Sequence, residues 1–150
     1  MQTGEQFLIF GLHGSRFALS LGQVQRVVRA VAVTPVPEPP PGMRGVINVA
    51  GQIVPVVDLC HHLHLPVTDV KPSDYLILVD NGRGRLALLV HEVLWIIRRG
   101  EEEIIAADHI LPGLGHIRGA VKMDQEIVLI HDLEEQQLPV LPPIDMAVSA

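Results

Sequence analysis

The chain has 150 residues, a net charge of −6, 48% hydrophobic residues and only 19% charged residues. This composition suits one small globular domain, or two very small ones, and excludes a disordered polar chain. The sequence shows no basic stripe, and its aromatic residues are three Phe, one Tyr and one Trp, which argues against nucleic acid as a partner.

The cysteine count and the N-terminus bear on the compartment. Cys60 is the only cysteine, so the sequence excludes a secreted disulfide scaffold. The first residues, MQTGEQFLIF, lack the basic region, the long apolar stretch and the cleavage site of a signal peptide. No apolar run approaches the ~18–20 residues that cross a membrane. The sequence therefore predicts a cytoplasmic protein without direct membrane insertion.

The first predicted elements are short strands. FLIFGL and RFALSL are rich in aliphatic residues, and the HGS between them contains the glycine that a tight hairpin favours. A proline-rich segment, residues 30–42, follows the strand VQRVV. Because proline cannot donate to a ladder, we expect a stiff extended loop there. The strands GVINVA and QIVPVVDL come next, and Pro55 in the second predicts a strand that is bulged or lies at a sheet edge.

The second half presents the same order of elements. Its predicted strands are YLILVD, RLALLV, VLWIIR, GAVKM and EIVLIHDL, and DNGRGR supplies the hairpin signal. Short strands at this spacing are typical of small barrels or a sandwich. Residues 139–150 follow the last strand, and we expect this tail to be loosely ordered.

Two segments of the chain are copies of each other. RGVINVAGQIVPVVDL, residues 44–59, aligns without a gap with RGAVKMDQEIVLIHDL, residues 118–133. The matched residues include Arg44 with Arg118, Gly45 with Gly119, and Asp58 with Asp132. The preceding strands also match if the second turn is one residue longer, which places Phe7 with Tyr75. The repeat predicts a duplicated small domain with pseudo-twofold symmetry.

Asp58 and Asp132 are the carboxylates that the copies share. Each opens a short helix-like run, DLCHHL or DLEEQQL. An Asp at the N-cap accepts hydrogen bonds from free backbone N–H groups, and Glu135 stands where a capping box requires it. We therefore predict two helix caps rather than a catalytic pair of carboxylates.

The segment CHHLH is the most suggestive local cluster. Cys60, His61 and His64 could supply part of a zinc site, which needs three or four ligands. The second copy has Glu134 and Glu135 where Cys60 and His61 stand, and a solvated helix face explains both copies. We predict no metal site and no cofactor, and metal binding through Cys60, His61 and His64 remains an alternative. No other set of residues predicts an active site, so the chain is expected to work through its surfaces.

The complete pattern resembles a known family. FLIFGLHGSRFALSLGQVQRVV, TPVPEPPPGMRGVINVAGQIVPVVDL, LALLVHEV and IRGAVKMDQEIVLIHDL are similar to the CheW family of chemotaxis adaptor proteins over about residues 5–138. The resemblance implies an all-β fold in which two pseudo-symmetric five-stranded Src-homology-3-like barrels share a hydrophobic core. It implies one CheW-like domain over residues 1–138, in which each Arg-Gly segment supplies the fourth and fifth strands of one barrel.

The resemblance also implies a function. Proteins of this family are non-enzymatic adaptors that couple the cytoplasmic tip of a chemoreceptor, a methyl-accepting protein, to the regulatory domain of a CheA-type histidine kinase. Membrane association would arise only through receptor arrays. By position, the receptor-binding residues would be Val24, Arg26, Val27, Val49, Ala50 and Gly51. The expected kinase contact is the loop after the prolines, at Met43 and Arg44.

The chain departs from its relatives at two of these positions. Relatives commonly carry an acidic residue where Arg26 stands, and an arginine in NLRG where this chain has Ala50. The two changes remove a potential ion pair together, and Arg26 is left without an obvious partner. They leave open a divergent paralogue that serves a pilus or surface-sensing pathway, and they predict a partner with an acidic residue opposite Arg26.

Overall fold

The chain forms two compact units, and the first of them is built from two separate stretches of the sequence. The computed structural model describes residues 4–30, 33–109 and 117–133. The first unit comprises residues 4–23 and 92–133, and the second comprises residues 24–91, within those limits. The predicted tail, residues 139–150, lies outside the described residues. In the part that is described, no helix has the length and apolar character needed to span a bilayer.

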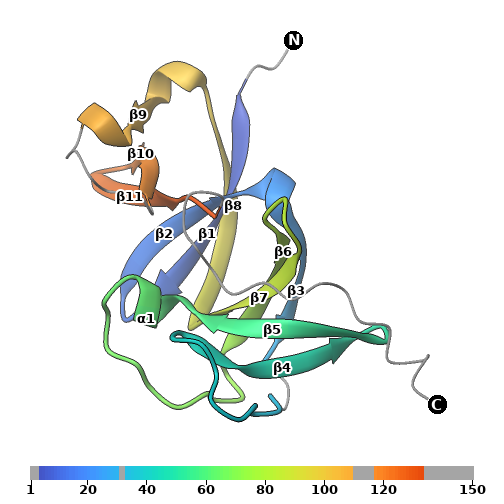
Figure 1. The fold of residues 1–150 in the computed structure, drawn as a ribbon. Helices are drawn as coiled ribbons and strands as arrows, with labels where there is room; N and C mark the ends of the chain where they lie inside the picture. Colours follow the sequence, from blue (N-terminus) through green and yellow to red (C-terminus); the bar gives the residue numbers. More distant parts are fainter. Residues whose placement is uncertain (1–3, 31–32, 110–116, 134–150) are drawn as a thin grey trace. The chain divides into compact units, whose positions relative to one another are not determined.

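The first unit is built on a single sheet. Among the described residues this sheet has six strands, in the order β8-β1-β2-β11-β10-β9 (Figure 1). Their bounds are β1 Glu5–Leu12, β2 Ser15–Ser20, β8 Glu92–Arg99, β9 Ile104–Ala106, β10 Ile117–Met123 and β11 Glu126–His131. Neighbouring strands run antiparallel except β11 and β2, which are parallel. The sheet encloses a buried cluster made of Phe7, Ile9, Ala18, Val121, Met123, Val128 and Ile130.

The second unit repeats this architecture with five strands in the described residues. The order is β3-β6-β7-β5-β4, again with one parallel pair, β5 with β7. The strand bounds are β3 Val24–Arg29, β4 Met43–Val49, β5 Gln52–Asp58, β6 Tyr75–Asp80 and β7 Arg85–Val90, and α1 spans Leu59–His62. The core of this unit is Ile47, Val54, Val56, Leu76, Leu78, Ala87 and Leu89. The predicted all-β fold with two related Src-homology-3-like sheets is confirmed, although the first sheet has six strands among the described residues where five were expected.

The sequence copies are not the structural units. Each sheet takes its first hairpin from one copy and its remaining strands from the other, so β1 and β2 join β8 to β11, whereas β6 and β7 join β3 to β5. The colours of Figure 1 show this exchange, because blue strands share a sheet with yellow and orange ones. Two ladders that join the copies, β1 with β8 and β3 with β6, are antiparallel and equivalent. Strand exchange therefore makes each unit depend on both halves of the chain.

The strand pairing also corrects the alignment of the first strands. Ile9 pairs with Trp95 in the first unit, and Leu78 pairs with Arg26 in the second. Since Trp95 and Arg26 are equivalent positions of the repeat, Ile9 corresponds to Leu78, and Phe7 corresponds to Leu76. The predicted match of Phe7 with Tyr75 is wrong by one residue. Both strands consist of consecutive apolar residues, so the sequence does not show which residues of the two strands are equivalent.

The shared Arg-Gly pair marks the same irregularity in both sheets. The β4–β5 ladder skips Arg44, and the β10–β11 ladder skips Arg118. A bulge of this kind leaves one residue unpaired and re-aims its side chain. The repeated segment therefore forms a bulged hairpin in each unit, and the arginine is the bulged residue.

The glycine of the pair is required by a close approach of two backbones. A Cβ atom on Gly45 would clash with the carbonyl oxygen of Thr34, and one on Gly119 would clash with that of Ile105. Gly45 also has a φ of 144°, which side chains rarely tolerate. In both units another segment of chain crosses directly over the glycine.

The proline-rich segment explains why the second unit has one strand fewer. In the first unit, the crossing segment is β9, which pairs with β10 over three residues. In the second, Thr34 makes a single bridge to Val46, with reciprocal backbone hydrogen bonds of 2.9 Å. Pro35 comes next and fixes its own φ at about −65°, away from the usual strand value, and the described pairing ends at Thr34.

Pro55 does not place β5 at an edge. This strand lies between β7 and β4, so the prediction of an edge strand is wrong, and the β4–β5 ladder has no register shift at Pro55. The parallel ladder with β7 begins at Val56, whereas its counterpart in the first unit begins at Leu129, the residue equivalent to Pro55. The missing N–H is accommodated because Pro55 pairs on one side only.

Candidate functional site

The predicted receptor-binding residues lie in two places in the second unit. Val24, Arg26 and Val27 are in β3, at one end of the strand order, and the others form the tip of the β4–β5 hairpin. In β3 the ladder with β6 skips Gln25, so this strand is bulged between Val24 and Arg26. Val24 is half-buried, whereas Arg26 and Val27 are exposed, Val27 by 37%.

The hairpin tip is a two-residue turn. Val49 pairs with Gln52, and Ala50 and Gly51 between them have φ values of 50° and 86°. Two positive φ values in succession identify a type I′ turn, which suits the twist of the strands but is unusual for alanine. The Gly51 N–H donates to the Asn48 side chain over 2.9 Å. Val49 packs against the core of the unit, and Ala50 is exposed.

One arginine joins these two parts of the site. Arg85, the first residue of β7, donates from Nε to Oε1 of Gln25 over 2.9 Å and from Nη1 to Oε1 of Gln52 over 2.6 Å. Gln25 is the bulged residue of β3, and Gln52 follows the hairpin turn directly. We call Arg85 with Gln25 and Gln52 the arginine bridge. The structure thus brings the two predicted segments together through residues that sequence reasoning missed.

The repeat contained a signal for the arginine bridge. Arg16 of the first unit is equivalent to Arg85, and its Nη1 lies 2.9 Å from Oε2 of Glu126, the counterpart of Gln52. The Arg16 guanidinium also lies 4.9 Å from the ring centre of Trp95, which is the counterpart of Arg26. An arginine in the same place of both copies could have been singled out for this reason.

The predicted kinase-binding residues differ in accessibility. Met43 is buried at the start of β4. Arg44 is partly exposed, and its Nη1 donates to Oδ2 of Asp58 over 3.1 Å. An open cleft of about 410 Å³ lies beside it, lined by Ala30, Val33, Pro35, Arg44, Val70, Lys71 and Pro72. Of the two predicted residues, Arg44 is the one whose side chain reaches this cleft.

The Asp58 cap is confirmed. Asp58 precedes α1 in an extended conformation, and its Oδ1 accepts from the Cys60 N–H over 2.9 Å. Its carboxylate is only 5% exposed and is held by Arg44 as well as by the cap. The helix predicted after Asp132 falls on residues outside the described ones, so the second cap remains a prediction.

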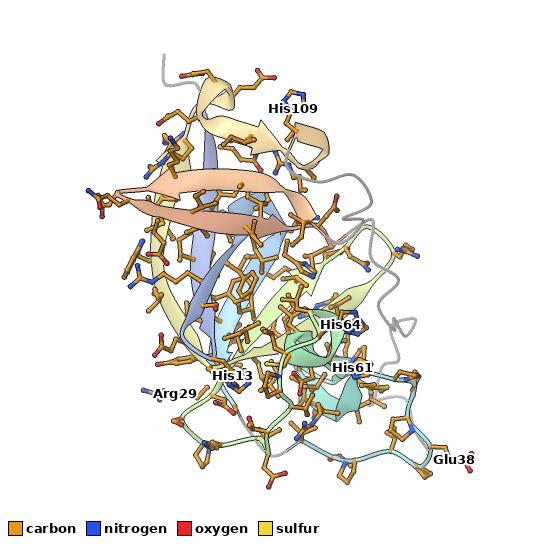
Figure 2. The ribbon with its side chains drawn as sticks, turned by 90° about the vertical axis from the view of Figure 1, so that its left-hand side faces the viewer. His13, Arg29, Glu38, His61, His64 and His109 are labelled. Carbon is orange, nitrogen blue, oxygen red and sulfur yellow. The ribbon has the colours of Figure 1, made fainter. Side chains whose placement is uncertain are left out.

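The CHHLH cluster does not gather as a metal site would. The ligand atoms of Cys60, His61 and His64 do not all lie within 4.8 Å of one another. Cys60 is buried, and burial together with the nearby Asp58 carboxylate raises the pKa of its thiol to about 11. A thiol that stays protonated at neutral pH is a poor nucleophile. His61 in α1 and His64 just after it are exposed (Figure 2).

The chain thus consists of two Src-homology-3-like sheets, and in the second an exposed strand and a hairpin are joined by Arg85. A family model, the CheW-like domain, matches residues 6–137. The chain is 31% identical over 107 residues to the chemotaxis protein CheW of Bacillus subtilis, covering 71% of this chain and 69% of that protein. It therefore belongs to the CheW-like family.

Two further similarities bear on fold and pathway. The crystal structure of the scaffolding protein TtCheW from Thermoanaerobacter tengcongensis superposes with a TM-score of 0.81 at 24% identity, covering 95% of this chain and 100% of that one. A shorter similarity, 27% over 84 residues, covers 56% of this chain and 47% of protein PilI of Pseudomonas aeruginosa. This partial match does not favour a pilus pathway over chemotaxis.

Proposed function

We infer that this protein is a non-enzymatic adaptor that couples a chemoreceptor to a CheA-type histidine kinase in chemotaxis signalling. Membership of the CheW-like family carries the inference. We place the protein in the cytoplasm, where receptor arrays would hold it near the membrane, and we assign it no cofactor and no catalytic step. A metal site formed by Cys60, His61 and His64 receives no support, because their ligand atoms do not all lie within 4.8 Å of one another.

We propose that the receptor tip binds at β3 and the β4–β5 hairpin. Arg26 and Val27 are exposed on the strand, Ala50 is exposed on the turn, and the arginine bridge holds the two segments together. An exposed apolar side chain next to a charged one is suited to an interface, where an apolar anchor supplies affinity and the charge supplies specificity.

The kinase regulatory domain is proposed to bind at the cleft beside Arg44. Arg44 and Lys71 place two cations around an apolar wall that includes Val33 and Val70. Lys71→Glu should weaken kinase binding without breaking the ion pair between Arg44 and Asp58. If Lys71→Glu binds the kinase fragment as tightly as the natural chain does, the kinase site lies elsewhere.

Binding measured separately with a receptor-tip fragment and with a kinase regulatory-domain fragment tests the adaptor function. An adaptor binds each fragment alone, and titrating one fragment into the complex with the other should show that it binds both at once. A chain that binds only the kinase fragment is a competitor rather than an adaptor, and a chain that binds neither contradicts the proposed function.

Val27→Asp tests the receptor surface. Removing an apolar anchor from an interface costs ~1–3 kcal/mol, so receptor binding should weaken roughly 5- to 150-fold while kinase binding is kept. Val67→Asp is the matched control, because Val67 is exposed by 51% in the same unit but outside the proposed surface. Equal losses in both variants would indicate a general effect of the new charge and would move the receptor site elsewhere.

A further inference from the structure

Arg85 occupies an unusual electrostatic position in the second unit. It is half-buried, and both of its hydrogen-bond acceptors are neutral amide oxygens, those of Gln25 and Gln52. A guanidinium has five N–H donors, and the bridge uses two of them. Asp80 is opposite Arg85 in the β6–β7 ladder, but its Oδ1 accepts from the Gly82 N–H over 2.8 Å and forms no ion pair with Arg85.

Arg26 is a second cation, on the strand that the arginine bridge contacts. It follows Gln25 in β3, and its side chain is exposed and forms no hydrogen bond or ion pair with the residues that the structure describes. Ala50 on the hairpin tip has no polar side chain with which to balance it. The chain as a whole carries a charge of −6, so two arginines without a carboxylate partner contrast with the overall charge of the protein.

The first unit shows the neutralised form of the same arrangement. Arg16 has an acidic partner, Glu126, where Arg85 has Gln52. Trp95 in this unit takes the place of Arg26 and lies against the Arg16 guanidinium. The charge of the arginine is therefore paired with a carboxylate in the first unit, whereas in the second its hydrogen-bond acceptors among the described residues are amide oxygens.

We propose that Arg85 is a positioning and specificity-determining residue of the receptor surface. By bridging Gln25 and Gln52, it holds the hairpin tip against β3. With Arg26 it forms a cationic centre that selects a partner segment carrying carboxylates. The second part of this inference rests on the proposed receptor function, whereas the first concerns the free protein.

Amide hydrogen exchange on the free protein tests the positioning role. In Arg85→Gln, the amides of residues 49–52 and of β3 should exchange faster, because the hairpin and the strand lose their common hydrogen-bond donor. Arg16→Gln is the matched control and should leave these amides unchanged. Unchanged exchange in Arg85→Gln would overturn the positioning role whatever the binding results are.

Titration calorimetry at two salt concentrations tests the selection by charge. The probes are a receptor-tip fragment and the same fragment with its Asp and Glu residues changed to Asn and Gln. The natural chain should prefer the acidic fragment, with a preference that shrinks at high salt. Arg85→Gln should bind that fragment about tenfold more weakly and with less salt dependence, whereas Arg85→Lys should retain most of the salt dependence.

A structural role alone would not produce this pattern. If the natural chain binds both fragments equally, or if Arg85→Lys and Arg85→Gln behave alike in salt, the charge selection is wrong. If the natural chain binds the kinase fragment but neither receptor fragment, the receptor function fails and the charge selection fails with it. The exchange experiment then still decides the positioning role.

Discussion

The two units differ most clearly in how they satisfy equivalent arginines. Arg16 in the first unit has a carboxylate partner and an aromatic ring, whereas Arg85 in the second has two amide oxygens. Both arginines connect the bulged edge strand with the hairpin of their sheet. Both units therefore have a bridge between these strands, but only in the first does the bridge contain a carboxylate.

The bulged arginines of the Arg-Gly pair have also acquired different partners. Arg44 bonds Asp58 of its own copy, whereas Arg118 makes two hydrogen bonds, of 2.6 and 2.7 Å, to Glu5 of the other copy. Asp74 stands where Glu5 would be in the second unit, but its carboxylate accepts a backbone N–H of the preceding loop. The hydrogen bonds from Arg118 hold the pKa of Glu5 below its usual value. The equivalent arginines thus bind different partners: Arg44 supports the helix cap at Asp58, and Arg118 links its strand to β1, which comes from the other copy.

The largest expected loss of stability is at the two glycines of the Arg-Gly pairs, where both units have a close crossing of backbones. Gly45→Ala and Gly119→Ala should each destabilise the protein by ~3 kcal/mol or more, because the new Cβ atom meets a backbone oxygen that cannot move independently. Gly82→Ala is the control, since Gly82 has a φ of 88° but open space around its Cβ position, and should cost only ~1 kcal/mol. Urea unfolding measures all three. A loss at Gly119 no greater than at Gly82 would contradict the close crossing of β9.

The next effect separates the two arginine pairs. Asp58→Ala removes a buried cap and an ion-pair partner, and we expect a loss of ~2–3 kcal/mol in the free energy of unfolding. Glu5→Ala removes a more exposed partner and should cost only ~1 kcal/mol. Thermal unfolding of the two variants gives the order. Equal losses would mean that the burial of Asp58 does not decide the strength of its pair.

A pH dependence should arise in the second unit. Burial, with a smaller contribution from His61, lowers the pKa of His62 below its ordinary value of 6.5, although Asp58 opposes the shift. His62 Nε2 is buried without a hydrogen-bond partner in the described structure and faces Gly42. The unfolded chain therefore binds a proton at His62 more readily than the folded protein does. The free energy of unfolding should have its full value above pH 6.5 and should fall as the pH drops from there through the lowered pKa.

Urea unfolding between pH 7.5 and 5 measures this dependence. His62→Gln should reduce the loss of stability in this window, whereas His109→Gln should not, because His109 is exposed in the first unit. Glu5 cannot account for a loss in this range, since its contribution is lost only as the pH falls below about 4.5, its ordinary pKa. The same pH dependence in His62→Gln as in the natural chain would contradict the assignment.

The smallest effect concerns the neutralised arginine. Arg16→Gln removes an exposed ion pair and a contact with Trp95, which together should contribute less than ~1.5 kcal/mol to stability. Receptor and kinase binding should be unchanged, since the charge of Arg16 is satisfied within the first unit. Calorimetry with both fragments checks this expectation, and a loss of receptor binding as large as that of Arg85→Gln would remove the distinction between the two units.

Much of the local structure followed from the sequence alone. The hairpins were predicted from glycine and asparagine, and the structure forms them at His13-Gly14 and around Gly82. The Asp58 cap and the repeated Arg-Gly hairpin were predicted correctly because such features depend on residues a few positions apart. The family resemblance rested on the same short motifs and is confirmed.

The tertiary structure alone decided which strands share a sheet and which side chains form the site. The alternation of apolar residues determines that a segment is a strand but not which copy supplies its neighbour, so the exchange of hairpins and the match of Phe7 with Leu76 were not foreseen. Gln25 and Gln52 are 60 and 33 residues from Arg85. Contacts over such separations leave no local pattern in the sequence. The three polar residues form the arginine bridge only because β3, β5 and β7 belong to the same sheet.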